Sequence, residues 1–544
     1  MNKIFQPEFF HSIKNYTRQQ FLKDLFAGII VGIVALPLAI AFAIASGVSP
    51  EKGLITAVIA GFLISFLGGS KVQIGGPTGA FVIIISGVIS KYGIDGLIIS
   101  TILAGILLIA FGLLRLGSLL RFIPHPLIVG FTAGIALIIF STQIPDALGL
   151  TIDEPAENFI AKWTSYFRAL NTTNYIALAI TAITILISLF FNKISKKIPG
   201  SFVAIILVTL VVAIFKIPVS TIESRFGEIS GNFEFIVPNI DFYNLQNYLS
   251  PAISIALLGA IESLLSAVVA DGMIGTNHKS NTELIGQGIA NIVTPFFGGI
   301  PATGAIARTA TNIKNGGRTP IAGMIHAVVL LLIMLVFGAL AKLIPMSCLA
   351  GILIVVAYNM SGWRSFISIF KSSAFDILIL LVTFILTVIV DLTVAIQIGM
   401  VLAAILFMKR MADNGLSILK ENTDEKSENY SDVPKEIEIY EISGPFFFGA
   451  AKHYAEVLKG HKNTTKILII RMRHVPFMDV TGINNFREAI RFLQDNKKKI
   501  FLSGVQPEVR KALDKNKISI LIGEENIFDN FDVALAKAKM ICHL

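Results

Sequence analysis

The chain has 544 residues, of which 54% are hydrophobic and only 15% are charged, and its mean hydropathy is +0.74. Since soluble globular proteins carry about 25% charged residues, this composition excludes a disordered chain and argues against an ordinary soluble enzyme. The net charge of +9 does not indicate nucleic-acid binding, because the basic residues stand beside apolar segments, as in membrane proteins. The two cysteines, Cys348 and Cys542, exclude a disulfide scaffold and suggest no metal site.

Apolar segments follow one another from about Asp24 to Met411 and predict a polytopic α-helical membrane protein with about fourteen spans. We expect residues 1–23 to be a cytoplasmic N-terminal segment and residues 24–411 to form a transmembrane transport domain. The candidate spans are 24–46, 51–68, 78–91, 95–114, 122–144, 174–191, 200–216, 250–271, 283–298, 303–313, 319–342, 346–359, 373–390 and 393–410.

Two of these segments, 78–91 and 303–313, are too short to cross about 30 Å of hydrocarbon as helices that rise about 1.5 Å per residue. Each follows a glycine–proline break, GGPTGA at Gly75–Ala80 and GGIPATGA at Gly298–Ala305. The shared order of residues indicates an internal repeat, although a pair of helix kinks would also explain the breaks. Short, interrupted segments at matching places in two halves are typical of a transporter binding site.

An odd number of spans in each half places the two halves in opposite orientations, so we expect a 7+7 inverted repeat with two short half-helices. An even total places both termini on one side of the membrane. Basic residues gather on that side, whereas the opposite loops, near 145–173 and 217–249, are acidic. The positive-inside rule therefore predicts that both termini are cytoplasmic, in a cell inner membrane or plasma membrane.

The composition changes after Arg410. Residues 412–431 are polar and acidic, which is typical of a linker, and residues 432–544 have the pattern of a small cytoplasmic α/β domain. Strands are predicted at Glu436–Ile442, Lys466–Met472 and Ile500–Val505. Amphipathic helices are predicted between and after them at 449–460, 482–495 and 507–516.

Ionisable residues inside membrane spans are costly to bury and are therefore candidates for function. Glu262 lies in the middle of Pro251–Asp271, among small residues that let another helix approach. Arg308 lies just past the second break, and its guanidinium offers planar, permanently charged recognition of an oxyanion. A structural buried ion pair between the two is the alternative. Asp24 falls near a span end, where we expect a capping role instead.

If both short helices point their N-termini at one spot, their backbone N–H groups and positive dipole ends create a site for an anion. Glu262 beside an anion predicts proton-coupled symport, in which the carboxyl takes up a proton as the anion binds. A sodium ion held by Glu262 and nearby carbonyls is the alternative coupling. The backbone and hydroxyl donors of the site are expected from Thr78, Gly79 and Ala80 and from Thr303, Gly304 and Ala305.

The sequence also resembles a known family. Leu36–Ala43 in the first span is similar to the entry signature of the sulfate permease (SulP) family of anion transporters, and the C-terminal domain resembles the STAS domain that ends most members. The resemblance covers nearly the whole chain and continues through Gly75–Thr78, Gly259–Gly275, Gly286–Gly288, Gly298–Thr311 and Gly317–Pro320.

The resemblance implies a core and a gate domain, substrate between the third and tenth spans, a homodimer and an elevator-type movement. It gives Glu262 a role in cation coupling and makes Arg308 face the anion. Ala305 and Ala307 stand where some animal members carry serine, so substrate preference does not carry over directly. The segments that most resemble a bacterial branch with a C4-dicarboxylate transporter are Ala260–Leu265, Ala305–Arg308 and Phe446–Ala450.

In the STAS-like domain, Met478–Gly482 is similar to the loop of anti-sigma-factor antagonists in which a serine is phosphorylated, and Thr481 stands at that position. Phosphorylation of Thr481, with a cytoplasmic regulatory protein as partner, is one interpretation. The other is a helix cap formed by Asp479 or Thr481.

The sequence thus predicts a secondary active transporter of small oxyanions of the sulfate, bicarbonate or C4-dicarboxylate class, which works in the lipid bilayer with proton symport as the expected coupling. An anion channel or exchanger and a sodium-coupled bicarbonate transporter are alternatives on the same fold. A nucleobase symporter and a membrane-tethered sensor are weaker alternatives, because they leave Arg308 or the two breaks unexplained. No nucleophile elbow, phosphate-binding loop or metal-ligand cluster is present in the sequence, so we expect no enzyme activity, cofactor or metal.

Overall fold

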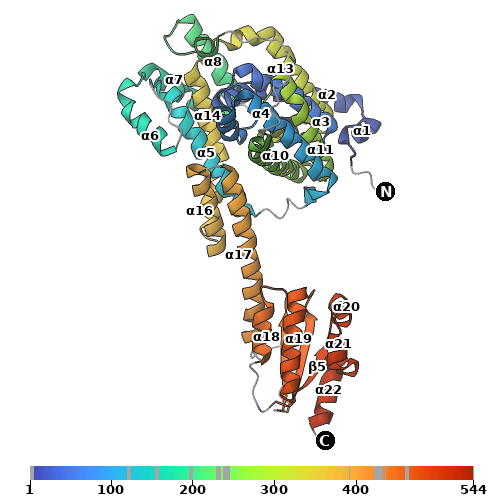
Figure 1. Ribbon diagram of the computed structural model, residues 1–544. Coiled ribbons are helices and arrows are strands. Elements are labelled where there is room, and N and C mark those ends of the chain that lie inside the picture. The colour runs from blue at the N-terminus through green and yellow to red at the C-terminus, as the bar shows by residue number, and fades with distance from the viewer. Residues whose placement is uncertain are drawn as a thin grey trace. The chain divides into compact units, whose positions relative to one another are not determined.

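The structure is a computed structural model and divides into two compact units, Met1–Met400 and Val401–Leu544 (Figure 1). It describes residues 5–118, 124–152, 159–194, 200–227, 235–236, 245–390, 392–421, 433–434, 436–459 and 465–542.

The first unit is built of helices, and each candidate span coincides with a helix or with half of one. Its longer helices are α2 (Arg18–Ala45), α3 (Pro50–Leu67), α4 (Phe81–Leu113), α5 (His125–Leu148), α7 (Tyr175–Ile194), α8 (Gly200–Ile214), α10 (Leu245–Ile274), α11 (Ser280–Val293), α13 (Pro320–Ala341), α14 (Met346–Met360), α16 (Ala374–Ile389) and the start of α17 (Leu392–Glu421). The shorter helices are α1 (Glu8–Ser12), α6 (Phe159–Arg168), α9 (Ile222–Phe226), α12 (Ile306–Lys314) and α15 (Trp363–Ile369).

Helix α4 spans two of the predicted segments, 78–91 and 95–114. Its backbone leaves the helical conformation between them at Gly93, where φ is 69° and ψ is −170°. Among the described residues, seven helical stretches are long and apolar enough to cross a membrane. The helices on the outside of the unit expose large apolar side chains that a bilayer would cover, among them Leu186 on α7 and Leu210 on α8.

The helix contacts repeat between the two halves of the chain. Helix α13 packs against α2 and α3, and α4 packs in the same way against α10 and α11. Helices α3 and α11 also contact each other, as do α5 and α14. We number the spans along the chain and count the second half of α4 as the fourth. When seven is added to or subtracted from both span numbers of a contact, the result is again one of these contacts. The unit is therefore a 7+7 inverted repeat, as the sequence predicts.

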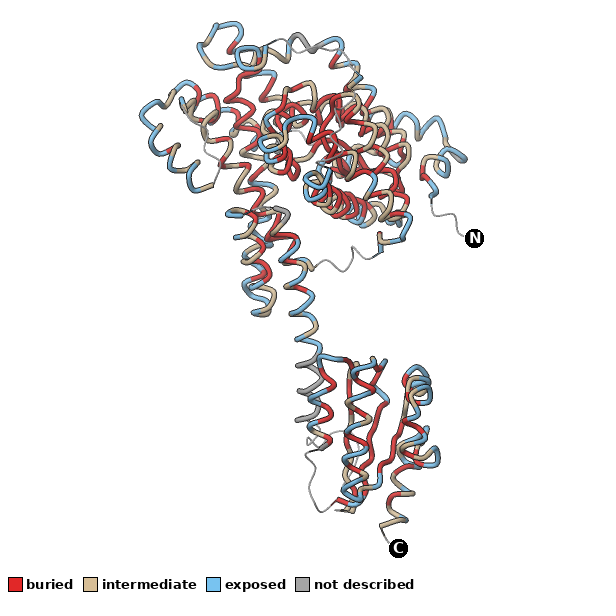
Figure 2. The backbone as a smooth tube through the Cα atoms, viewed as in Figure 1, coloured by how far each residue is buried: buried red, intermediate tan, exposed pale blue. Residues whose placement is uncertain are grey.

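We call α2, α3, α4 and α10–α13 the core helices, since they pack mainly on one another, and α5, α7, α8, α14 and α16 the gate helices. Figure 2 shows buried residues gathered in the middle of the first unit. Small residues bring the core helices together: a Cβ on Gly288 of α11 would lie 2.6 Å from the carbonyl oxygen of Gly105 on α4, and the reverse distance is also 2.6 Å.

The two glycine–proline breaks meet at the centre of the core helices. The two-residue strands β1 (Gly75–Gly76) and β2 (Thr303–Gly304) pair antiparallel, with Gly75 opposite Gly304 and Gly76 opposite Thr303. All four residues are buried. Non-helical backbone at this depth is tolerated because protein, and not lipid, surrounds it. The pairing places the starts of α4 and α12 beside each other.

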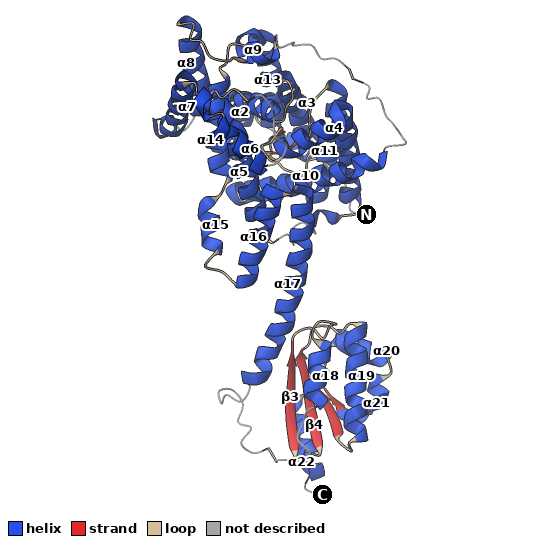
Figure 3. Ribbon diagram, turned by 60° about the vertical axis from the view of Figure 1, so that its left-hand side comes forward, coloured by secondary structure: helices blue, strands red, loops and turns tan. Residues whose placement is uncertain are grey.

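The second unit contains a four-stranded parallel sheet in the order β3 (Ile437–Ser443), β4 (Ile467–His474), β5 (Lys499–Ser503) and β6 (Ile527–Phe528) (Figure 3). One face of the sheet packs against α18 (Ala451–Lys459), α19 (Val480–Asp495), α20 (Pro507–Lys515) and α21 (Ile518–Ile522), and the other packs against α22 (Phe531–Cys542). The strands and helices predicted for this domain are therefore confirmed.

The predicted linker differs in its first part. Helix α17 continues through Glu421, so residues 412–421 are helical and do not form an open linker. Polar composition suggested a linker, but this segment holds no proline and includes good helix formers that let the preceding helix continue. The remaining residues of the predicted linker, 422–431, lie outside the described residues.

We predict that Gly288→Ala lowers the thermal stability of the purified protein, because the new methyl group would push α11 away from α4. Overpacking of this kind costs about 1–3 kcal/mol. Gly272→Ala is the matched control, since a Cβ at that exposed helical position meets no atom within 4 Å. Thermal unfolding in detergent followed by intrinsic fluorescence measures both. Equal midpoints for the two variants would contradict the close α4–α11 packing.

Candidate functional site

The first break contacts the carboxylate of Glu262. Thr78, in the turn before α4, donates a hydrogen bond from its hydroxyl to Glu262 Oε2 at 2.9 Å, across 184 positions of sequence. Both side chains are only partly buried, whereas the strand residues beside them are fully buried. The structure therefore brings the predicted cation-coupling residue to one of the predicted ligand-binding residues.

The second break is held by α10. Thr303 donates its hydroxyl to the carbonyl of Gly259 at 3.0 Å, and the Ser263 hydroxyl lies 2.7 Å from Thr303 Oγ1. The Gly304 N–H donates to Ser263 Oγ at 3.1 Å. These donors already have partners inside the protein. Thr303 and Gly304 thus fix the position of the second break, and a ligand would need other donors.

Free backbone N–H groups remain at the starts of the two short helices. Ala305 N–H donates to the Ile74 carbonyl at 2.8 Å, so the open amides of α12 begin at Ile306 and Ala307, the first two residues of the helix. Both residues are exposed, and the first amides of a helix have no partner within it. Gly79 and Ala80 occupy the corresponding place before α4. The sequence analysis missed Ile306 and Ala307 because it took the second helix to begin at Thr303.

Arg308 is buried, with 2% of its surface exposed, and its guanidinium binds the first break. Nη1 donates to the Gly75 carbonyl at 3.5 Å and Nη2 donates to the Pro77 carbonyl. Gly76 leaves the room for this contact, since a Cβ there would lie 2.5 Å from Nη1. Arg308 and Glu262 are both described, and they form no ion pair within 4.0 Å. The buried ion pair considered from the sequence is therefore not formed, because Arg308 bonds to backbone carbonyls instead.

A second carboxylate, that of Glu283 on α11, is fully buried and supports the first break from behind. Its Oε2 accepts hydrogen bonds from the N–H groups of Gly69 at 2.8 Å and Ser70 at 3.1 Å. Its Oε1 accepts from the side-chain amides of Gln73 at 3.0 Å and Gln287 at 2.9 Å. The sequence analysis missed Glu283 because it stands at the edge of a predicted span. Its i,i+4 spacing from Gln287 is the signal that could have indicated it.

Side chains of α12 complete the support. Thr309 Oγ1 accepts a hydrogen bond from the Ile74 N–H at 3.0 Å, and Asn312 donates to the Val72 carbonyl at 2.9 Å. The segment that leads into the first break is thus held by both α11 and α12. Asp24 is fully buried inside α2 and does not lie at a helix end, although the sequence analysis expected it there. It accepts from the N–H of Arg318 at 2.8 Å and from the hydroxyl of Thr319 at 2.6 Å, and so holds the start of α13.

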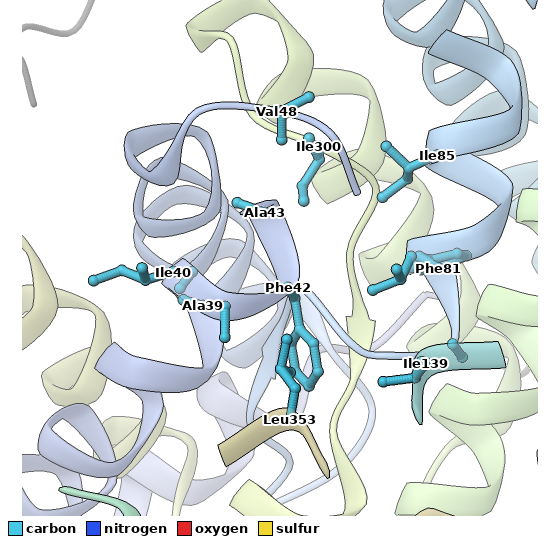
Figure 4. Close-up of a cluster of buried hydrophobic side chains, with 14 of the residues drawn as sticks. Ala39, Ile40, Phe42, Ala43, Val48, Phe81, Ile85, Ile139, Ile300 and Leu353 are labelled. Carbon is cyan, nitrogen blue, oxygen red and sulfur yellow. The ribbon is translucent and has the colours of Figure 1, made fainter. Parts of the chain in front are cut away.

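The exposed side of the first break faces apolar side chains of other helices. A Cβ on Gly79 would lie 3.0 Å from Met360 Sδ, 3.1 Å from Ile139 Cδ1 and 3.2 Å from Phe42 Cε1. Figure 4 shows the ring of Phe42 lying between Ile139 and Leu353. Met360, Leu353 and Ile139 belong to the gate helices α14 and α5. The candidate site therefore lies where the core helices meet the gate helices.

In the second unit, Asp479 caps α19. Its Oδ1 accepts from the Gly482 N–H at 2.6 Å and its Oδ2 accepts from the Phe448 N–H at 2.9 Å. The capping role that the sequence gave to Asp479 or Thr481 therefore belongs to Asp479. Thr481 is exposed in the first turn of the helix.

Comparisons with known proteins match this architecture. The model of the sulfate permease family matches residues 21–383, and that of the STAS domain matches residues 431–534. A Bacillus subtilis protein named "Putative sulfate transporter YvdB" is 43% identical over 95% of this chain and 98% of its own length. The bicarbonate transporter BicA of Picosynechococcus is 32% identical over 91% of this chain and 90% of its own length.

Two solved structures share the fold. The transmembrane domain of a cyanobacterial bicarbonate transporter BicA aligns with a TM-score of 0.63 at 31% identity, over 71% of this chain and 98% of that one. The structure of SLC26A9 aligns with a TM-score of 0.86 at 18% identity, over 97% of this chain and 92% of that one. The second likeness concerns the fold alone.

We predict that Glu283→Ala destabilises the protein far more than Glu262→Gln does. Removing the Glu283 carboxylate leaves four buried donors without an acceptor, which costs at least about 3 kcal/mol. Glu262 accepts a hydrogen bond from the Thr78 hydroxyl, at a partly exposed position. Thermal unfolding of both variants in detergent measures the difference, and Glu283→Gln, which keeps an acceptor oxygen, should fall between them. A midpoint of thermal unfolding for Glu283→Ala equal to that of the wild type would contradict the supporting role of Glu283.

Proposed function

Because the chain belongs to the sulfate permease family of anion transporters, we propose that it is a secondary active transporter of small oxyanions. The class comprises sulfate, bicarbonate and C4-dicarboxylates. The names of two relatives support the first two, since the protein at 43% identity is named a putative sulfate transporter and the one at 32% identity a bicarbonate transporter. Segment resemblances noted in the sequence support the third.

One observation supports the anion site above all: the paired breaks leave amides of two short helices open beside a buried arginine. The proposed donors are the N–H groups of Gly79, Ala80, Ile306 and Ala307 and the hydroxyl of Thr78. Such amides bind anions through hydrogen bonds and the positive ends of the helix dipoles, although the amides themselves have no full positive charge. In this proposal Arg308 adds positive charge from behind, and Thr303, Gly304 and Ala305 hold the second break in place.

Glu262 is the proposed coupling residue. Its hydrogen bond from Thr78 joins the carboxyl to the first break, so protonation of the carboxyl and binding of an anion would act on the same turn. A protonated Glu262 removes a negative charge next to the anion, which favours proton symport. A sodium ion at the same carboxylate is the alternative coupling, and an exchanger or channel would need no such carboxyl.

The proposed movement is of the elevator type, in which the core helices shift along the gate helices together with the bound anion. The contact of the first break with Ile139 and Met360 of the gate helices supports it, because apolar surfaces can slide without breaking hydrogen bonds. We further propose a homodimer with both termini in the cytoplasm, in a cell inner membrane or plasma membrane. Exposure of Thr481 is compatible with phosphorylation and with a regulatory partner at the STAS domain.

We predict that Glu262→Gln abolishes the pH dependence of anion uptake, because a glutamine cannot take up the coupled proton. Initial uptake rates into proteoliposomes, measured across a series of external pH values, test this. The variant should elute from a sizing column like the wild type, which would separate lost coupling from lost folding. Unchanged proton-driven uptake by Glu262→Gln would contradict the coupling role.

Arg308→Ala should raise the KM for the transported anion by more than about tenfold, because a charge beside the anion is lost. Arg308→Lys keeps the charge but cannot bind both the Gly75 and Pro77 carbonyls, so it should lie between Arg308→Ala and the wild type. Arg364→Ala is the surface control, since Arg364 is exposed and stacks on Trp363. An unaltered KM in Arg308→Ala would remove Arg308 from the site.

A further inference from the structure

A polar pocket lies between the core and gate helices, beside the first half of α4. Its volume is about 400 Å³, and it is lined by the first half of α4, the start of α10, α5, α6 and the end of α16. Lys91 lies on α4 beyond the first break, and Ser250 and Pro251 lie near the start of α10, before Glu262. These helix ends therefore lie on the side of the first unit that is opposite its N-terminus.

Only two of the described residues that line this pocket are charged, and both are lysines, Lys91 and Lys162. Lys91 Nζ lies 5.2 Å from the centre of the Tyr92 ring, and that ring packs edge-on against Tyr248 at 5.6 Å. This contact directs the Lys91 ammonium toward the aromatic wall of the pocket, although the residue itself is exposed.

Lys162 is half-buried on α6 and also lines a neighbouring pocket that holds Asp146 and Arg225. Asp146 Oδ1 already forms an ion pair with Arg225 Nη1 at 2.7 Å. Within the part of the chain that the structure describes, neither Lys91 nor Lys162 forms an ion pair or a hydrogen bond. The pocket therefore has two positive charges that no described acidic residue neutralises.

Three hydroxyl groups of the pocket already donate to backbone carbonyls, and those of Ser86, Tyr92 and Ser250 also line it. Ser141 donates to the Leu137 carbonyl at 2.8 Å, Thr142 to the Ile139 carbonyl at 2.8 Å, and Thr387 to the Thr383 carbonyl at 2.7 Å. These three hydroxyls offer only acceptor oxygens to a ligand. The two ammonium groups are therefore the charged donors that an anion in this pocket would meet, with neutral hydroxyl groups beside them.

The inner end of the pocket reaches the candidate site. Ile83 and Ile84 line it from the first turn of α4, directly after Gly79 and Ala80. On the gate side, Ile138 lines the pocket, and its neighbour Ile139 contacts the position of Gly79. The inner end of the pocket thus lies about one helical turn from the open amides.

We propose that Lys91 and Lys162 form a capture site for small divalent oxyanions, such as sulfate or a dicarboxylate, at the outer entrance to the transport site. With no acidic side chain among the described residues that line the pocket, its two positive charges attract a divalent anion more strongly than a monovalent one, since the Coulomb energy scales with the product of the charges. The capture site raises the local concentration of the anion near the transport site and does not bind it tightly. That the anion passes from this pocket to the transport site rests on the proposed function.

The chain provides its own reporter of binding. Trp163 follows Lys162 and donates from Nε1 to the pocket residue Ser141 at 3.1 Å, and the only other tryptophan is Trp363. In purified Trp363→Phe protein, sulfate should change the Trp163 fluorescence saturably, and acetate at equal ionic strength should change it less. The double substitution Lys91→Gln with Lys162→Gln should abolish the sulfate response, and Lys91→Arg with Lys162→Arg should keep it. A response that survives the double glutamine variant would overturn the site.

Transport supplies the second readout. The double glutamine variant should raise the KM for external sulfate about fivefold or more and flatten its dependence on ionic strength, with kcat unchanged. Lys216→Gln is the matched control, because it removes an exposed lysine after α8 that does not line the pocket. Lost fluorescence response with unaltered KM would overturn the capture role. Sulfate binding to a wild-type protein that transports no anion would contradict the proposed function and leave the binding site standing.

Discussion

The first unit depends on one constraint: two stretches of broken backbone lie inside a membrane protein, where every N–H and C=O needs a partner. The β1–β2 pairing satisfies part of this demand, and α10 satisfies the second break through Ser263. Glu283 satisfies the loop before the first break with both carboxylate oxygens. Because protein groups provide these partners, the amides at the starts of α4 and α12 are left for the anion in the proposed site.

The charges of the core follow from the same constraint. A guanidinium and two carboxylates at this depth would be costly without partners, and each has them. Arg308 is held by carbonyls of the first break and Glu283 by four donors, so both have fixed positions. Glu262 differs, since it is partly exposed and accepts from the Thr78 hydroxyl. It is therefore the carboxyl best suited to exchange a proton or a cation during transport.

The fold could be predicted in large part from sequence, because apolar runs report burial in lipid and alternating segments report the small α/β domain. The pairing of the two breaks could not, since nothing in the strand residues Gly75 and Gly304 specifies a partner more than two hundred positions away. The roles of Thr303 and Gly304 changed for the same reason: their donors bond to α10, a contact that only the packed structure creates. Composition also did not indicate that α17 continues to Glu421.

The most direct test of the central claim is uptake by the purified wild-type protein in proteoliposomes. Labelled sulfate, bicarbonate and succinate would be offered in parallel, without a gradient, with an inward proton gradient and then with an inward sodium gradient. We predict accumulation of at least one of these anions above its equilibrium level under the proton gradient. Flux that follows only membrane potential and anion concentration, with no accumulation under either cation gradient, would contradict coupled transport through Glu262.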